Sequence, residues 1–158
     1  MKPEILLQTV ERDDPAVMAL YEPFILEADG PLAHQVDVGA EAAKGPPADL
    51  VPPTGAMLLA RVDGAAAAIG GVRHLDTEVA EVKSMYVSPA HRGLGLGRRI
   101  LDELHRVAAE SGCRASRLDT SDYLTAAIGL YRASGYHEVP DYNANPKASI
   151  WFERRLAA

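Results

Sequence analysis

Cysteine is nearly absent from the sequence, since Cys113 is the only one. A single cysteine excludes an internal disulfide, and it also excludes a zinc site built from a cysteine cluster. The five histidines are scattered along the chain and form no HExxH pair, which is the usual pattern of a helical zinc site. We therefore expect no bound metal.

Long hydrophobic runs are also missing. Hydrophobic residues make up 47% of the sequence, yet no stretch reaches the roughly 18 apolar residues that a membrane-spanning helix needs. The start, MKPEILLQTVERDD, has acidic residues early and lacks the long apolar centre of a signal peptide. These features predict no membrane association and a cytoplasmic location.

Basic residues are too few for a nucleic-acid surface. Lysine and arginine number 16 against 22 aspartate and glutamate residues, which gives a net charge of -6. Proteins that bind nucleic acid usually carry a net basic surface, so we expect no nucleic-acid partner. The acidic balance is compatible with a small cationic substrate.

Alternating and helical hydrophobic patterns follow one another along the chain. With 158 residues and no internal repeat or linker, the sequence predicts one mixed α/β domain over residues 1–158. The pair Asp63-Gly64 between two apolar runs is typical of a tight β-hairpin. Strands are expected at residues 3–10, 56–62, 65–75, 80–87, 115–121, 136–139 and 148–156, and helices at 15–29, 100–111 and 126–134.

Two segments of the N-terminal half have weaker patterns. The helix expected over residues 15–29 contains Pro23, which should break it into two pieces. Residues 31–55 are rich in proline and show no clear period, which predicts a long loop with at most one helical turn. Loops of this length in a compact domain are usually functional or mobile.

The most informative stretch is VSPAHRGLGLGRRIL at residues 87–101, where three glycines alternate with other residues before a helical pattern. A helix N-terminus leaves backbone N–H groups unpaired and carries a partial positive charge. Glycines let the preceding chain turn so that several N–H groups point at one spot, and they have no Cβ to hold a ligand away. The stretch predicts a site for a phosphate-bearing ligand, with added charge from Arg92, Arg98 and Arg99.

Two common phosphate-binding motifs fit this stretch poorly. A P-loop would end in Gly-Lys-Ser/Thr, which is absent. A dinucleotide-binding fold would place a third glycine where Arg98 stands, and no second βαβ half follows. Asp119 does lie near the position of a ribose-binding acid, so a nucleotide-dependent oxidoreductase is disfavoured but left open.

Residues 87–97 resemble the acetyl-CoA pyrophosphate loop of the GNAT superfamily of N-acetyltransferases. The family pattern Arg/Gln-x-x-Gly-x-Gly/Ala is matched by Arg92, Gly95 and Gly97. A second stretch, AAIGLYRASGY at residues 126–136, resembles the family's helix followed by glycine and an aromatic residue. The order of strands and helices is also similar to that of the family over nearly the whole chain.

The resemblance implies a fold and a co-substrate. The fold is a central twisted, mostly antiparallel sheet of about seven strands flanked by helices. The strands that end near Val87 and Ser121 should splay apart in a V and hold the acetyl-pantetheine arm of acetyl-CoA. The residues implied as contacts for the arm and the pyrophosphate, largely through their backbone, are Met85, Val87, Arg92, Gly93, Leu94, Gly95, Leu96, Gly97 and Arg98.

The resemblance also implies two catalytic residues. Tyr131 matches the tyrosine that meets the CoA sulfur in the family and is the candidate general acid, with core packing as the alternative. Glu81 lies on the strand before the loop and is the candidate general base, directly or through water. The alternative for Glu81 is a surface carboxylate paired with Lys83 or with a neighbouring strand. One departure is Leu124, where the family often has an asparagine that bonds the cofactor arm.

Other chemically active residues are weaker candidates. His74, Asp76 and Asp119 could act as a base, but no motif marks them. Cys113 follows a glycine in a turn and has no nucleophile motif, which favours direct transfer without an acyl-enzyme.

A small-molecule amine is the expected acceptor. It should be bound by the first helices, residues 31–55 and the C-terminal strands, where Tyr142, Asn143 and Asn145 provide either hydrogen bonds or ordinary turn chemistry. The leading hypothesis is an N-acetyltransferase that moves the acetyl group of acetyl-CoA to a primary amine. A non-catalytic acyl-CoA-binding sensor is the alternative, and a homodimer is left open.

Overall fold

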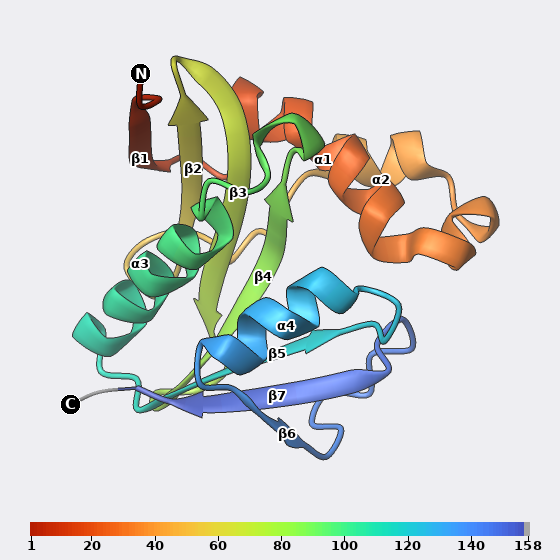
Figure 1. Ribbon diagram of the computed structural model, residues 1–158. Helices are drawn as coiled ribbons and strands as arrows, with labels where there is room; N and C mark the ends of the chain where they lie inside the picture. The colour runs from red at the N-terminus through yellow and green to blue at the C-terminus, as the bar shows by residue number, and fades with distance from the viewer. Residues whose placement is uncertain (157–158) are drawn as a thin grey trace.

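A computed structural model describes residues 1–156 and contains one seven-stranded sheet with helices on both faces (Figure 1). The strand order is β1-β2-β3-β4-β5-β7-β6, and every neighbouring pair is antiparallel except β4 and β5. The predicted fold class is confirmed. The strands are β1 (Ile5–Val10), β2 (Ala56–Val62), β3 (Ala65–His74), β4 (Val79–Val87), β5 (Ala115–Thr120), β6 (His137–Val139) and β7 (Ile150–Arg155), and the helices are α1 (Pro15–Asp29), η1 (Gly30–Gln35), α2 (Val38–Lys44), η2 (Pro89–His91), α3 (Leu96–Glu110) and α4 (Thr125–Ala133).

The hairpin between β2 and β3 forms as the sequence predicts. Asp63 and Gly64 have φ angles of 49° and 86°, and a two-residue hairpin turn of this kind needs positive φ at both central positions. The turn fixes which residues of the two strands pair, so that Val62 lies opposite Ala65.

The parallel strands β4 and β5 separate after a short contact. Only Val79–Glu81 pairs with Ala115–Arg117, although β4 continues to Val87 and β5 to Thr120. In Figure 1, β1 to β4 run alongside one another while β5 and β7 cross them at a steep angle. The predicted V-shaped splay is therefore present, and it leaves one edge of β4 without a strand partner.

A β-bulge interrupts β4 beside this opening. Gly71 pairs with Lys83 and Ile69 with Tyr86, so that Ser84 and Met85 together face the single residue between. Ser84 has a φ of 58°, which is unusual for a residue with a side chain. Bulges bend a strand and often lie next to active sites, because they redirect side chains and leave backbone groups without a ladder partner.

Both faces of the sheet are covered by hydrophobic cores. Successive residues of β2 alternate between them, since Leu58 and Ala60 pack with α3 and α4 while Met57 and Leu59 pack with α1. Burial on both sides explains why β2 reads as a continuous apolar run rather than an alternating one. The cores hold the two arms of the V in place.

Helix α1 is continuous, which corrects the expected break at Pro23. Asp14 caps the helix by accepting a hydrogen bond from the Ala16 N–H at 2.8 Å, and Pro23 lies inside it. Proline removes only one helical hydrogen bond. The buried side chains on either side of it keep the helix against the sheet, namely Val17, Leu20, Tyr21 and Ile25.

Residues 31–55 contain more helix than the sequence led us to expect. The 3-10 helix η1 follows α1 directly, and α2 covers Val38–Lys44. Asp37 caps α2 through the N–H of Ala40 at 3.0 Å, which is a helix-start signal that the proline content obscured. The expectation of a loop with at most one helical turn is wrong here and holds only for the residues after Gly45.

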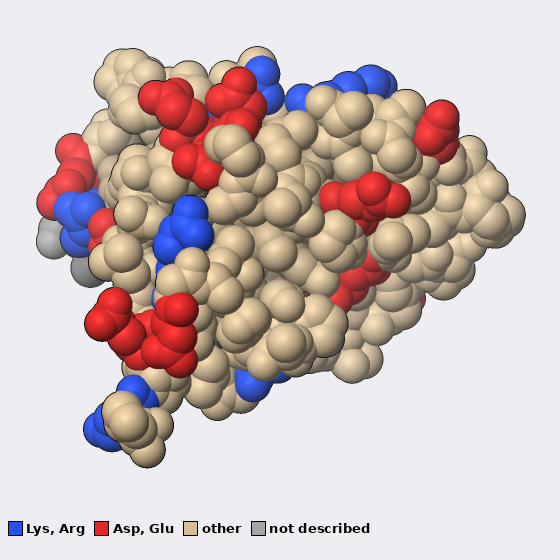
Figure 2. Space-filling model, turned by 90° about the horizontal axis from the view of Figure 1, so that it is seen from above, with Lys and Arg blue, Asp and Glu red and all other residues tan. Residues whose placement is uncertain are grey.

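Charged side chains do not form one continuous field on the face seen from above. Figure 2 shows small acidic and basic groups separated by wide uncharged areas.

Within residues 1–156, no helix has the length and hydropathy needed to cross a bilayer.

A buried polar network joins α3, β5 and β7 beneath α4. His105 is 7% exposed, and its Nδ1 accepts a hydrogen bond from Arg154 at 3.1 Å, because a guanidinium can only donate. The other ring nitrogen, Nε2, must then carry the proton and donate it to the Tyr136 hydroxyl at 2.6 Å. The hydroxyls of Tyr136 and Ser116 share a further hydrogen bond at 2.8 Å. Every member of this chain requires a neutral His105.

This network predicts an acid-sensitive contribution to stability. Burial, and secondly the charge of Arg154, lower the pKa of His105 to about 4. The unfolded chain binds the proton near pH 6.5, so it takes up more protons than the folded protein between these values. The contribution is therefore complete above about pH 6.5 and declines as the pH falls toward 4.

We expect His105→Gln to reduce the pH dependence of stability. Between pH 7.5 and pH 5, urea unfolding should show the parent losing about 1–2 kcal/mol more than the variant, since the titrating group is gone from the latter. Carboxylates titrate alike in both proteins and cancel in the comparison. Equal losses in parent and variant would show that His105 does not titrate on unfolding.

Candidate active site

Two cavities meet where β4 and β5 separate. The larger, which we call the central cleft, has a volume of about 590 Å³ and lies between α1, the bulge of β4, the end of β5 and α4. The smaller, the loop cavity, has about 330 Å³ and lies between the end of β4, the glycine loop and α4. Four residues line both, so the two spaces are adjacent: Glu27, Met85, Ala127 and Tyr131.

The glycine loop forms one wall of the loop cavity. Gly93 and Gly95 have φ angles of 85° and 75°, a region that residues with a Cβ rarely adopt. A Cβ added at either position would meet no heavy atom within 4 Å. The space in front of the loop is therefore open to a ligand that approaches the backbone closely.

Helix α3 begins directly after this loop. Gly95 is its N-cap, and no side chain caps it. The first amides of the helix are thus left without a side-chain acceptor, and the helix dipole favours negative charge at this end. These are the properties of a site for phosphate groups.

Nearly all residues expected to contact the co-substrate lie around the loop cavity. The exception is Leu94, which is 38% exposed and does not line this cavity. The members of the predicted set that line the cavity are Met85, Val87, Arg92, Gly93, Gly95, Leu96, Gly97 and Arg98.

The loop arginines are held by protein partners. The Arg92 guanidinium forms an ion pair with Glu27 and donates through Nε to the Val87 carbonyl at 3.1 Å. Arg98 pairs with Asp102 at 3.1 Å, one helical turn further on. The Val87 carbonyl is therefore occupied rather than free, and the backbone amides are the main donors toward an anion here.

His91 is a residue of this cavity to which sequence reasoning gave no role. It lies in η2 and lines the loop cavity. Its Nδ1 atom is buried and has no hydrogen-bond partner within residues 1–156. Buried polar atoms are nearly always satisfied, so this nitrogen fits a ligand that supplies the missing partner. Together, the unpaired His91 Nδ1 atom and the open space before Gly93 and Gly95 indicate that the residues lining the loop cavity suit the phosphates of a CoA thioester.

Tyr131 lies at the junction of the two cavities. It projects from α4 and is 6% exposed, with its ring at 5.9 Å from the Tyr136 ring and 6.3 Å from the Phe152 ring. Its hydroxyl makes no hydrogen bond within residues 1–156, whereas the Tyr136 hydroxyl makes two. Burial, and then the nearby charges of Asp119 and Glu27, raise the pKa of Tyr131. The hydroxyl therefore stays protonated at neutral pH and can donate.

Glu81 is buried rather than on the surface, which corrects the alternative expected for it, and it lines neither cavity. It is fully buried, and its Oε1 accepts two hydrogen bonds from Arg73, at 2.8 and 3.1 Å. Its Oε2 accepts from the Tyr142 hydroxyl at 2.5 Å and more weakly from the Asn143 amide at 3.4 Å. The structure does not bring Glu81 together with Tyr131, and its role as the base stays a prediction.

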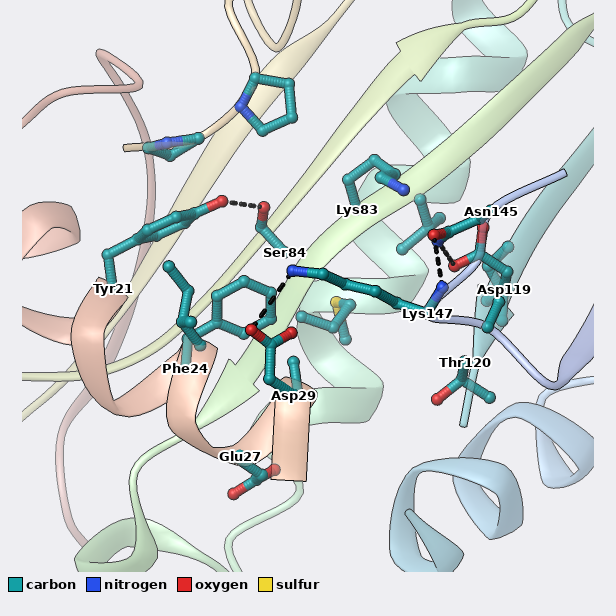
Figure 3. A pocket seen from close by; sticks show the side chains of 18 of the residues that line it. Tyr21, Phe24, Glu27, Asp29, Lys83, Ser84, Asp119, Thr120, Asn145 and Lys147 are labelled. Atoms are coloured by element: carbon teal, nitrogen blue, oxygen red, sulfur yellow. Dashed lines mark hydrogen bonds and ion pairs between the residues drawn. The ribbon is translucent and has the colours of Figure 1, made fainter. Parts of the chain in front are cut away.

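Asp119 is the carboxylate of β5 that faces the central cleft together with Tyr131. It accepts hydrogen bonds from the side-chain amides of Asn143 at 2.6 Å and Asn145 at 3.2 Å. Asn143 also reaches Glu81, so one amide links the two carboxylates. Figure 3 shows Asp119 and Asn145 side by side on one wall of the cleft.

The other sequence candidates lie elsewhere. His74 contacts Ser111 Oγ at 2.8 Å, and Asp76 accepts from the N–H groups of the turn before β4. Cys113 is buried, and burial raises the pKa of its thiol. None of these three lines either cavity.

Known proteins share this sequence pattern and this fold. A family model described as the Acetyltransferase (GNAT) family matches residues 40–136. An IAA acetyltransferase of Azospirillum brasilense is 37% identical over 104 residues, which are 63% of this chain and 67% of that relative. The resemblance predicted from the glycine loop and from residues 126–136 is confirmed.

Solved structures agree with the architecture. An acetyltransferase of the GNAT family from Staphylococcus aureus has a TM-score of 0.76 at 18% identity, covering 98% of this chain and 100% of the other. A PaiA N-acetyltransferase of Thermoplasma acidophilum in complex with coenzyme A has a TM-score of 0.72 at 13% identity, covering 96% and 99%. At these identities the likeness concerns the fold.

Proposed function

The chain belongs to the acetyltransferase (GNAT) family, as an acyltransferase that uses acetyl-CoA, and we propose that it acetylates a primary amine of a small molecule directly. The observation that carries this proposal is the junction of the two cavities at Met85 and Tyr131. One cavity suits a phosphate-bearing thioester and the other is open to an acceptor. Amine-dependent release of the CoA thiol tests the proposal.

The residues around the loop cavity would hold acetyl-CoA. The amides of the glycine loop and of the α3 N-terminus would bind its phosphates, and the unpaired edge of β4 near Met85 would bind the pantetheine arm. The bound thioester supplies an electrophilic carbonyl carbon and a thiolate leaving group. Two tasks then remain for side chains, which are to remove a proton from the ammonium and to give one to the sulfur.

Tyr131 is suited to protonate the sulfur. Tyr131 lines both cavities, and its hydroxyl has no hydrogen-bond partner within residues 1–156. Its raised pKa keeps the proton on the oxygen at neutral pH, so the O–H can donate to the sulfur as negative charge develops there. As the amine nitrogen bonds to the carbonyl carbon and the carbon–sulfur bond breaks, the tyrosine proton would pass to the sulfur, and the proton that the nitrogen loses on becoming an amide would restore Tyr131.

Asp119 is suited to accept the proton of the ammonium. It faces the cleft beside Tyr131, and two asparagine amides fix its carboxylate. Glu81 is proposed to act one step away, by holding Asn143 and Tyr142 in place. Because Glu81 lines neither cavity, proton transfer to it would need a water path around these two residues.

The two carboxylates should differ in the pH dependence of their variants. Asp119→Asn should lower kcat/KM by about 10²–10⁴-fold where the acceptor is mostly ammonium, and less as the pH approaches the amine's own pKa. Glu81→Gln should lower kcat/KM by a factor that does not change with pH. The reason is that it disturbs the positions of Asn143 and Tyr142 rather than the removal of the proton. Profiles of kcat/KM against pH provide the measurement. The reverse assignment, with a pH-dependent defect only in Glu81→Gln, would make Glu81 the base through water.

A further inference from the structure

The central cleft is lined by equal numbers of acidic and basic side chains. Four of these eight side chains neutralise one another in two pairs, and a fifth, Glu27, pairs with Arg92 of the glycine loop. Lys44 pairs with Glu41 at 2.9 Å, and Lys147 reaches across the cleft to Asp29 at 3.3 Å (Figure 3). The full set of charged lining residues is Arg12, Lys44, Lys83 and Lys147 with Glu27, Asp29, Glu41 and Asp119.

Arg12 remains without an acidic partner. The residue is half-buried, and the only hydrogen bond of its guanidinium within residues 1–156 goes from Nη1 to the Pro46 carbonyl at 2.8 Å. No carboxylate of the described residues lies within 4.0 Å of it. A partly buried charge normally has a counter-charge, and the remaining N–H groups form a fork that fits a carboxylate. Arg12 lies close to Tyr21, whose pKa its charge lowers while burial raises it more.

Lys83 is the second cation with free donors. Its side chain is 23% exposed, and its Nζ lies 3.8 Å from Glu81 Oε1, which Arg73 already occupies with two hydrogen bonds. The ammonium donates no hydrogen bond within residues 1–156. In the view of Figure 3, Lys83 comes from β4 between Tyr21 on one wall and Asp119 on the other.

Asp119 is an anion of the cleft that has no cationic partner within residues 1–156. It is the one acid of the lining whose partners within residues 1–156 are amides rather than a cation, namely Asn143 and Asn145. The cleft thus offers one uncompensated anion beside Tyr131 and two under-compensated cations, Arg12 and Lys83. An acceptor that matches this arrangement carries positive charge at one end and negative charge at the other.

We propose that the acceptor is an amine that also bears a carboxylate, an amino-acid-like compound whose ammonium faces Asp119 and whose carboxylate is bound by Arg12 and Lys83. This inference rests on the proposed function, since it assigns the acceptor side of the same cleft. It disfavours plain alkylamines, which leave the cations unmatched, and disfavours diamines more strongly, because their second ammonium would meet Arg12 and Lys83.

Calorimetric titration of the protein with CoA bound separates these classes without turnover. The probes form two pairs, 6-aminohexanoate with hexylamine and lysine with cadaverine. In each pair only the first compound carries a carboxylate. We expect each carboxylate-bearing probe to bind at least about tenfold more tightly than its match. Arg12→Gln and Lys83→Gln should each reduce that preference several-fold. Arg114→Gln removes the same charge at an exposed position outside the cleft, with a side chain 82% exposed, and should preserve it.

Three results would overturn the inference. They are equal or tighter binding of hexylamine and cadaverine, a preference that survives both cleft substitutions, and absence of binding by all four probes. Thiol release from acetyl-CoA is measured in parallel. If hexylamine triggers thiol release and the probes show no preference for a carboxylate, the proposed acceptor class is wrong and the proposed acetyl transfer stands. A carboxylate preference that depends on Arg12, without thiol release for any amine, supports the carboxylate site and removes the proposed transfer.

Discussion

Replacement of Gly95 by valine is expected to weaken acetyl-CoA binding at least about 100-fold, equivalent to roughly 2.7 kcal/mol, while the protein stays folded. The new side chain would stand in the open space before the loop, where the phosphates must approach the amides. It would also have to adopt a φ of 75°, which costs a β-branched residue about 1–3 kcal/mol locally. Calorimetric titration with acetyl-CoA measures the loss.

Gly64→Val provides the matched control. Gly64 has a φ of 86° and equally open surroundings, but it lies in the β2–β3 turn, outside both cavities. The two variants should lose similar stability in thermal unfolding, and only Gly95→Val should lose acetyl-CoA affinity. Normal affinity in Gly95→Val would mean that the loop does not hold the co-substrate.

Tyr131→Phe is expected to keep acetyl-CoA affinity and to lower the rate of the chemical step by about 10²–10⁴-fold, or roughly 3–5 kcal/mol of barrier. The ring packs equally well without its oxygen, and no hydrogen bond within residues 1–156 is lost with it. What disappears is the O–H of the residue that lines both cavities. Single-turnover measurement isolates the chemical step from product release.

Tyr136→Phe should show the opposite result. Its hydroxyl bonds His105 and Ser116, so its loss leaves buried polar atoms unsatisfied, at about 1–3 kcal/mol of stability. Its hydroxyl lies outside both cavities, and the chemical step should be little changed. If Tyr131→Phe carried out the chemical step at the parent rate, Tyr131 would be a packing residue and another donor would protonate the sulfur.

The parts of the site that the sequence predicted are those encoded in neighbouring residues. Gly93 and Gly95 indicate backbone with positive φ, and the helical pattern after them predicts the N-terminus of α3. Tyr131 was found because it lies within one contiguous motif on α4. In each case the physical requirement and the residue that meets it are close in the chain.

What the sequence did not predict depends on partners far apart in the chain. Glu81 lies opposite Arg73 in the β3–β4 register, and that pairing buries its carboxylate. Asp119 receives its asparagine partners from the segment between β6 and β7, more than 20 residues away. The continuity of α1 through Pro23 likewise follows from packing against the sheet. Local helix propensity does not include such long-range contacts and therefore predicted a break.

The most direct measurement is thiol release from acetyl-CoA by the parent protein with and without an amine, together with mass analysis of the amine. We expect release to require the amine and to match the acetylated product one to one, with no acetyl group left on the protein. Acetyl-CoA binding without amine-dependent release would contradict acetyl transfer and would make the protein an acyl-CoA sensor instead.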